Sequence, residues 1–157
     1  MDLRRTLGLA LAILLAAPAA GAGEGQPWAL FLAHVGESDK PLPATIICVR
    51  CPSRQTIDQV LGNAGITRRQ FEIPARTMAP IEAIVADLVP NTAPPTFPYG
   101  TYKVTLLRPD AKTEQALLDP KATRRMLARL RHTIPAHLGD LRRHLTNLQQ
   151  RLLPPAP

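Results

Sequence analysis

The chain has 157 residues, of which 45% are apolar, and this is the length and composition of one ordinary globular domain. Its 17 prolines exclude long uninterrupted helices and strands, because proline breaks the interior hydrogen-bond pattern of both. The formal net charge of +7 is unevenly spread: residues 121–157 hold eight basic residues and one acidic residue, whereas residues 23–120 hold nine basic and ten acidic residues. A basic field confined to one region indicates an anionic partner more directly than a high overall charge does.

The N-terminal segment has the three parts of a secretory signal peptide. Residues 1–5 are basic, residues 7–20 are apolar and rich in Leu and Ala, and Ala20-Gly21-Ala22 offers the small-residue pattern that signal peptidases cleave. An uncleaved anchor is the alternative, but a spanning helix needs about 20 apolar residues, and this run is shorter and contains Pro18. We therefore expect a signal peptide over 1–22, a periplasmic or secreted location, and no integral membrane segment after cleavage.

The first elements after the signal peptide are two strands and a helix. Residues 28–35 and 44–49 are apolar and partly β-branched, which predicts two strands separated by a polar turn. Ser53 is a suitable N-cap for a helix that carries one apolar stripe and ends at the glycines of 62–65.

The middle of the chain alternates between proline-rich breaks and short elements. Residues 71–73 suit a short strand, and a helix is expected up to Pro90 with Pro80 in its first turn. Residues 99–107 alternate well and predict the clearest strand of the chain. Residues 110–119 are expected to be a connector or a short helix.

The C-terminal segment predicts a basic amphipathic helix that kinks at Pro135 or divides there into a helical hairpin. Asp119 and Pro120 suit a helix start. His132, His137 and His144 are expected at the surface, and His137 and His144, seven residues apart, are expected on one face. The apolar side chains follow a/d-type spacing and form a seam: Leu127, Leu130, Ile134, Leu138, Leu141, Leu145, Leu148 and Leu152.

Together these elements predict an α+β fold. A small domain over 23–118 would hold a mixed sheet of three to four strands and two short helices. The basic segment would follow over 119–153, and a proline-rich tail over 154–157.

The only two cysteines, Cys48 and Cys51, form a C-x-x-C pair between the second strand and the first helix. In an oxidising compartment such a pair is usually a disulfide, which here would pin the strand-to-helix corner. At these two cysteines the segment resembles the thioredoxin-type arrangement, which implies thiol–disulfide exchange with Cys48 as nucleophile and Cys51 as resolving thiol. Two thiolates can also bind Cu(I). We predict a disulfide and assign no metal site, because a structural zinc site needs four ligands and only two are present.

The basic helical segment carries the predicted binding site. Its charge matches phospholipid headgroups, lipopolysaccharide phosphates or an acidic protein, at about 1 kcal/mol for each basic side chain held near an anionic bilayer. Nucleic acid would match the charge equally well, but the signal peptide argues against it. The alternative is a solvated arginine face on a helix whose seam packs on the sheet. The predicted partner- or anion-binding residues are Arg124, Arg125, Arg129, Arg131, Arg142 and Arg143.

The sequence lacks the common catalytic motifs. It has no G-x-S-x-G, no H-E-x-x-H and no phosphate-binding glycine loop, so we expect no cofactor. The favoured function is a non-enzymatic binding or assembly protein that docks to a partner or an anionic surface through its basic C-terminal helices. The alternative is a periplasmic thiol–disulfide oxidoreductase that uses Cys48 and Cys51. The leucine seam can close within the chain or between subunits, so a homo-oligomer through the seam is a further hypothesis.

Overall fold

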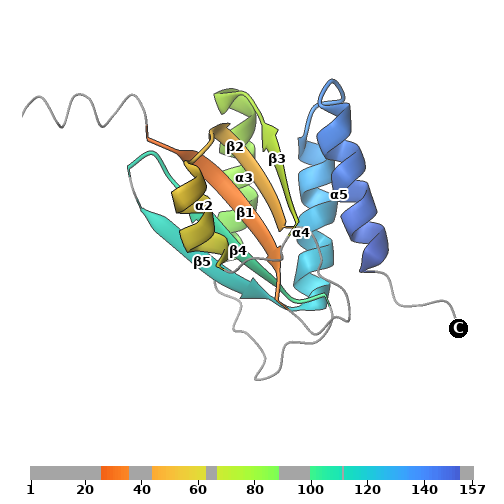
Figure 1. Cartoon of the computed structure of the whole chain (residues 1–157). Coiled ribbons are helices and arrows are strands. Elements are labelled where there is room, and N and C mark those ends of the chain that lie inside the picture. Colours follow the sequence, from red (N-terminus) through yellow and green to blue (C-terminus); the bar gives the residue numbers. More distant parts are fainter. Residues whose placement is uncertain (1–25, 36–43, 63–66, 89–99, 111, 153–157) are drawn as a thin grey trace, which may run out of the picture.

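The computed structural model describes residues 26–35, 44–62, 67–88, 100–110 and 112–152. Within these residues, five strands form one mixed sheet that is flanked by four helices (Figure 1). The strands are β1 (Trp28–His34), β2 (Ala44–Arg50), β3 (Arg68–Glu72), β4 (Tyr102–Leu107) and β5 (Thr113–Leu118). The helices are α2 (Arg54–Leu61), α3 (Ala75–Ala86), α4 (Pro120–Thr133) and α5 (Gly139–Arg151).

The strands lie in the order β3-β2-β1-β4-β5, so that β1 is central and β3 and β5 are the two edges. β1 is antiparallel to both β2 and β4, and β4 is antiparallel to β5. The one parallel pair joins β2 to β3, and helix α2 makes the crossover between them, as a parallel connection requires. The predicted α+β class is confirmed, with five strands where three to four were expected.

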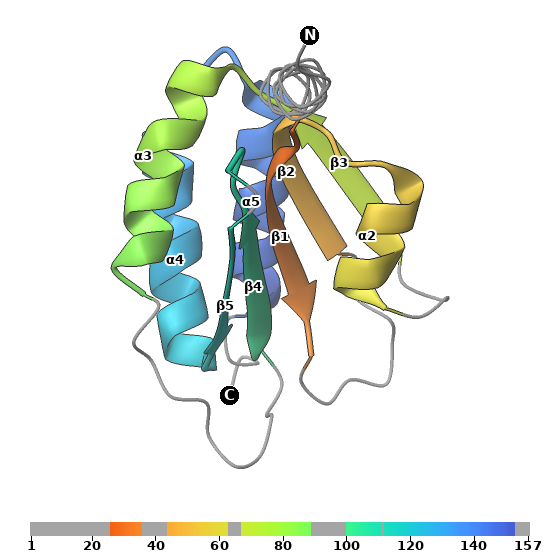
Figure 2. The ribbon, with the colours of Figure 1, turned by 90° about the vertical axis from the view of Figure 1, so that its left-hand side faces the viewer.

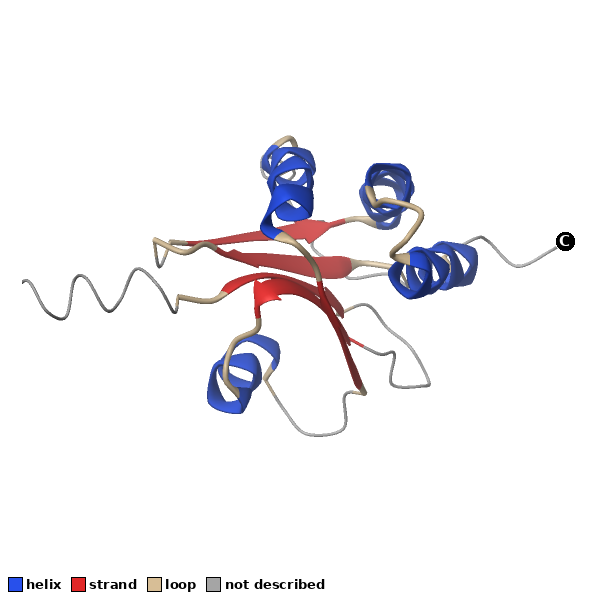
Figure 3. Cartoon of the chain, turned by 90° about the horizontal axis from the view of Figure 1, so that it is seen from above, coloured by secondary structure: helices blue, strands red, loops and turns tan. Residues whose placement is uncertain are grey.

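The two faces of the sheet are covered by different numbers of helices (Figure 3). Helix α2 lies alone on one face, whereas α3, α4 and α5 lie on the other, as the perpendicular view also shows (Figure 2). We call these the α2 face and the three-helix face. Helices α4 and α5 pack side by side and are connected by residues 134–138 (Figure 1).

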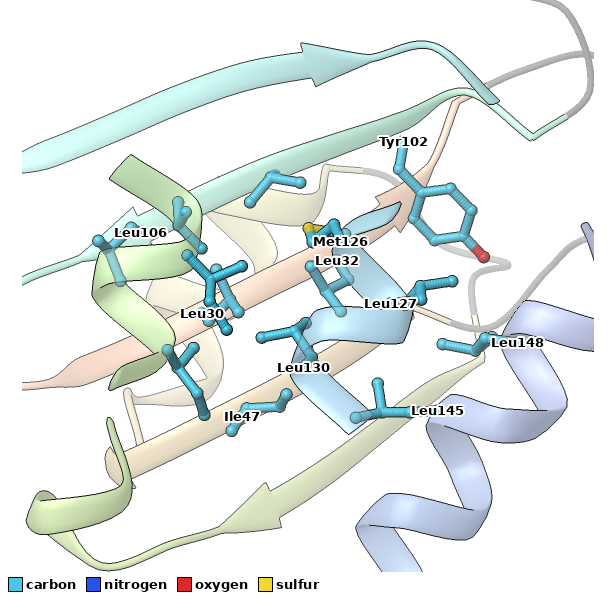
Figure 4. Close-up of a cluster of buried hydrophobic side chains, with 14 of the residues drawn as sticks. Leu30, Leu32, Ile47, Tyr102, Leu106, Met126, Leu127, Leu130, Leu145 and Leu148 are labelled. Atoms are coloured by element: carbon cyan, nitrogen blue, oxygen red, sulfur yellow. The ribbon is translucent and has the colours of Figure 1, made fainter. Parts of the chain in front are cut away.

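The main hydrophobic core lies between the sheet and the three-helix face (Figure 4). It joins alternate residues of the strands, such as Leu30, Leu32 and Ile47, to leucines of the C-terminal helices, such as Leu130 and Leu145. The predicted boundary at 118/119 therefore runs between elements that share one core. The α2 face holds a second, smaller cluster made of Ala29, Phe31, Ile46, Cys48 and Ile57.

Helix starts follow the capping signals in the sequence. Ser53 accepts a hydrogen bond from the backbone N–H of Thr56, and Asp119 accepts one from Ala122, so each caps its helix as predicted. Pro120 occupies the first turn of α4, where its missing N–H costs no hydrogen bond.

Pro80 is placed differently from the prediction. Helix α3 begins at Ala75, so Pro80 lies inside it rather than in its first turn. Proline has no N–H, so the backbone carbonyl of Arg76 loses the helical hydrogen bond that residue 80 would donate. Pro80 and Arg76 are both exposed, so this carbonyl lies toward the solvent side. Thr77 and Met78 are buried, and this burial favours the longer helix.

The prediction for residues 110–119 was wrong, because Thr113–Leu118 is strand β5. Its Glu, Gln, Ala and Leu residues have high helix propensity, so the local sequence favoured a helix. The close antiparallel pairing with β4, which buries Ala116 and Leu118, overrides that preference. The predicted signal peptide, the predicted polar turn between the first two strands and the predicted tail at 154–157 lie outside the described residues.

Candidate functional site

The leucine seam of the C-terminal helices faces the chain's own core. Seven of its eight members are buried, and Leu138, in the connection between α4 and α5, is partly buried against the same cluster. Figure 4 shows Leu127 and Leu130 of α4 beside Leu145 and Leu148 of α5, all pointing into the core. Because the seam is buried in the core of its own chain, it offers no surface to a second subunit. The homo-oligomer through the seam is therefore not supported.

The arginines of α4 lie on its flanks and its outer side. Arg125 and Arg129 are exposed, while Arg124 and Arg131 are partly buried. Arg129 faces α3, because its guanidinium lies 3.0 Å from Asp87 at the end of that helix. Arg124 and Arg131 are seven residues apart and therefore share the opposite flank, toward α5.

The arginines of α5 extend this basic surface onto the second helix. Arg143 is exposed and lies 3.6 Å from Asp140, one turn earlier on the same helix. Arg142 is partly exposed on the flank next to Leu145, which packs in the core shared with α4. The structure thus gathers all six predicted arginines on two adjacent helices. We call this set (Arg124, Arg125, Arg129, Arg131, Arg142 and Arg143) the hairpin arginines.

Most of this charge has no counter-charge in the described part of the chain. Only Arg129 and Arg143 form ion pairs there, and both pairs are solvent-exposed. Exposed pairs contribute about 0–1 kcal/mol, so they neither fix the fold nor remove the positive field. Arg124, Arg125, Arg131 and Arg142 form no ion pair with any described residue. The outside of α4 and α5 is therefore a basic surface that the fold itself does not use.

His144 departs from the prediction that it is exposed. It is 5% exposed, its Nε2 lies 2.6 Å from the hydroxyl of Thr45 in β2, and its ring lies 5.1 Å from that of Phe71 in β3. Burial, with the nearby charges of Arg69 and Arg151, lowers the pKa of His144 to about 4. The neutral ring therefore ties α5 to the sheet.

The sequence contains a signal for this buried position. The spacing of seven residues between His137 and His144 predicts one shared helix face. Helix α5 begins only at Gly139, however, so His137 lies outside it and the two histidines share no helix face. His144 instead continues the buried spacing of Leu141, Leu145 and Leu148.

The cysteines form a disulfide at the corner between β2 and α2. Their Cα atoms are 5.0 Å apart. Cys48 belongs to strand β2 and is 0% exposed, whereas Cys51 is partly exposed. Helix α2 begins only at Arg54, so neither sulfur belongs to its first turn.

This geometry bears on the proposed thiol chemistry. Thiol–disulfide exchange requires an incoming thiolate to reach a sulfur, and the buried Cys48 is closed to such an attack. Arg50 lies between the two cysteines, and its Nε donates to the backbone oxygen of Gln26 at 2.7 Å. These contacts favour a structural disulfide and argue against Cys48 as the nucleophile.

One open cavity of about 530 Å³ lies between the end of β3 and the beginning of α5. Its wall combines apolar side chains with carboxylates from both elements. The lining residues of the β3 side are Gln70, Phe71, Glu72 and Ile73, and those of the α5 side are His137, Leu138, Gly139, Asp140 and Leu141. It does not contain the hairpin arginines.

The described residues show neither a metal cluster nor a membrane-spanning helix. Over 26–35, 44–62, 67–88, 100–110 and 112–152, no three side chains of His, Cys, Asp or Glu come together to hold a metal ion. In the same ranges no helix combines the length and apolarity needed to cross a bilayer. Comparisons with protein-family models, with curated proteins and with solved structures found no match.

Proposed function

We propose that this protein is a non-enzymatic binding protein that docks onto an anionic surface through the hairpin arginines. The observation that carries this proposal is the two-sided character of α4 and α5. Their apolar side is consumed by the core, while four of the six arginines on the other sides have no counter-charge among the described residues. Charges that do not stabilise the fold are available to a partner.

The proposed destination narrows the class of partner. A signal peptide at residues 1–22 would send the mature chain to the periplasm or outside the cell. Anionic lipid headgroups are a partner that such a protein can meet at a membrane surface, and they attract basic segments. Each basic side chain near such a surface contributes about 1 kcal/mol, so four together contribute up to about 4 kcal/mol at low salt. Binding of this strength is reversible and weakens as salt screens the charges.

The proposal is tested by sedimentation with lipid vesicles that contain phosphatidylglycerol. The test variant replaces Arg124, Arg125, Arg131 and Arg142 with Gln, and leaves the two arginines that pair with aspartates intact. We expect the wild type to bind at low salt and to dissociate as salt is raised. The variant should lose at least about tenfold in affinity for the vesicles. This is a smaller loss than the upper limit of about 4 kcal/mol for four charges would give.

A matched control separates the site from the net charge. The control variant replaces Arg54, Arg76, Lys103 and Lys112 with Gln, which removes four positive charges from other elements. None of these four forms an ion pair with a described residue. Retained binding by the control, with lost binding by the hairpin variant, supports the proposal. An equal loss of vesicle binding in both variants would show that binding depends on net charge and not on the hairpin arginines. If the wild type does not bind, an anionic lipid surface is not the partner.

A further inference from the structure

The sheet edge formed by β3 is unpaired among the described strands. β3 is one of the two edge strands and pairs on its inner side with β2, whereas no described strand pairs with its outer side (Figure 1). A strand edge presents backbone donors and acceptors to any chain that can align with it. The five residues of this edge are Arg68, Arg69, Gln70, Phe71 and Glu72.

The pairing with β2 fixes which backbone groups point outward. The oxygen of Thr67 accepts from Ala44, and the N–H of Ile73 donates to Cys48, each at 2.8 Å. Because backbone groups alternate in direction along a strand, the odd-numbered residues of β3 bond to β2. Arg68, Gln70 and Glu72 therefore direct their N–H and C=O groups away from the sheet.

We propose that the outer edge of β3 pairs antiparallel with the same edge of a second copy, about a twofold axis at Gln70, so that the two sheets join. This register aligns the three outward-facing residues of each copy. Gln70 opposes Gln70 of the second copy, and Arg68 opposes Glu72 in both directions. The two edges then exchange backbone hydrogen bonds at every outward-facing position.

The side chains of β3 are complementary to themselves in this register. Charged residues on an edge strand normally prevent edge-to-edge pairing, because like charges meet. Here the basic residues lie at one end and Glu72 at the other. Antiparallel pairing therefore places Glu72 of one copy opposite Arg68 of the other, which within its own chain also pairs with Asp58 of α2. Arg69 also comes opposite Phe71 of the second copy, and the guanidinium of Arg69 already lies 5.2 Å from the Phe71 ring within one chain.

The cavity at the end of β3 provides space for the incoming basic end. Its lining includes Gln70 and Phe71, together with the acidic residues Glu72 and Asp140. In the proposed register, Arg69 of the second copy comes next to Phe71 on the three-helix face, on the side of the cavity that Asp140 lines. The opposite sheet edge lacks such a feature, because β5 contains Glu114 as its single charged residue. Self-complementarity is therefore specific to the β3 edge.

The register is tested by disulfide cross-linking of full-chain variants that each carry one added cysteine besides the Cys48–Cys51 disulfide. In Gln70→Cys the two introduced thiols would face each other across the twofold axis. We expect Q70C to form covalent dimers roughly tenfold or more faster than a collision control, because the pairing holds the two sulfurs together. Gln115→Cys on β5 is that control. Glu72→Cys is a register control, because residue 72 opposes residue 68 and lies far from its own copy.

Analytical ultracentrifugation tests the edge without a new cysteine. Gln70→Pro removes an outward N–H and leaves every hydrogen bond to β2 in place, which an edge strand tolerates. We expect the wild type to dimerise as its concentration rises and Q70P to stay monomeric with an unchanged far-UV spectrum. Were Q70P to misfold, the cross-linking series would still decide. A wild type that is monomeric at millimolar concentration, or Q70C that cross-links no faster than Q115C, would overturn the proposal.

Discussion

The two faces of the sheet are stabilised in different ways. The three-helix face buries 21 residues in one cluster, with contributions from every strand except β3 and from α3, α4 and α5. The α2 face buries five residues beneath one helix of eight residues. A single short helix gains little from burial, and it is on this face that the chain has its disulfide. The comparison indicates that the disulfide secures the weaker layer, while the leucine seam holds the stronger one and leaves four of the six hairpin arginines without an ion pair to a described residue.

The largest difference between the faces is expected from core truncations. Leu130→Ala removes a fully buried side chain from the three-helix face and should lower the free energy of unfolding by about 2–5 kcal/mol. Leu61→Ala, at a partly buried position on α2, should cost about 1 kcal/mol, because less surface is lost. Urea unfolding of both variants checks this, and equal losses would contradict the unequal layers.

The second prediction concerns pH and the contact that ties α5 to the sheet. The pKa of His144 is lowered to about 4 in the folded protein, first by burial and then by Arg69 and Arg151. An unfolded chain restores its ordinary pKa of about 6.5. Between these two values the unfolded state binds a proton that the folded state does not, so the free energy of unfolding falls as pH drops from about 6.5 to about 4. Above about pH 6.5 His144 is neutral in both states, so its contribution to the free energy of unfolding has its full value.

This dependence is measured by urea unfolding across pH 4 to 7. His144→Gln keeps a polar partner for Thr45 and should flatten the pH dependence. His132→Gln, at an exposed position on α4, is the matched control and should leave the dependence as it is in the wild type. A slope unchanged by H144Q would show that His144 is not responsible.

Removal of the disulfide should have a smaller and more local effect. A C48A/C51A double variant loses the constraint of a very short loop, which is worth at most about 2 kcal/mol. Amide hydrogen exchange should become faster in α2 and stay unchanged in α4 and α5. Faster exchange throughout the three-helix face would contradict the local role.

The same disulfide separates the favoured function from its alternative. A structural pair should have a reduction potential below about −300 mV, whereas catalytic pairs have values of about −120 to −230 mV. The burial of Cys48 predicts the lower value. A glutathione titration that gave a value in the catalytic range would favour the oxidoreductase, with Cys51 as the accessible sulfur.

The smallest effects are expected at the helix caps. Asp119→Ala removes the N-cap of α4, whose bond to Ala122 measures 2.7 Å, and should cost about 1 kcal/mol. Ser53→Ala removes the longer, exposed cap of α2 and should cost about 0.5 kcal/mol. Thermal unfolding of the two variants shows which substitution lowers the stability more. A larger loss from S53A would reverse the expected ranking of the two faces.

The sequence was sufficient where a local signal coincided with the tertiary contact. The caps at Ser53 and Asp119 were predicted because a side chain and a backbone N–H three residues apart need no distant partner. The leucine spacing gave the buried side of α4 and α5. It could not say whether the seam closes inside the chain, because that depends on how the sheet is covered.

Long-range contacts account for what the sequence did not reveal. Strand β5 depends on pairing with β4 against its own helix propensity. The burial of His144 depends on Thr45, which is 99 residues away. The burial of Cys48 depends on the way α2 covers β2, and the pattern C-x-x-C does not specify it.

The central claim is that the outer side of the C-terminal helices, and not the α2 face, meets the anionic surface. An environment-sensitive fluorophore can be attached to a cysteine introduced at Gln150 on the outer side of α5 or at Gln59 on the outer side of α2. Both positions are exposed. On addition of phosphatidylglycerol vesicles, we predict a spectral shift for the label at residue 150 and none for the label at residue 59. A shift at residue 59 alone, or at neither position, would contradict the account.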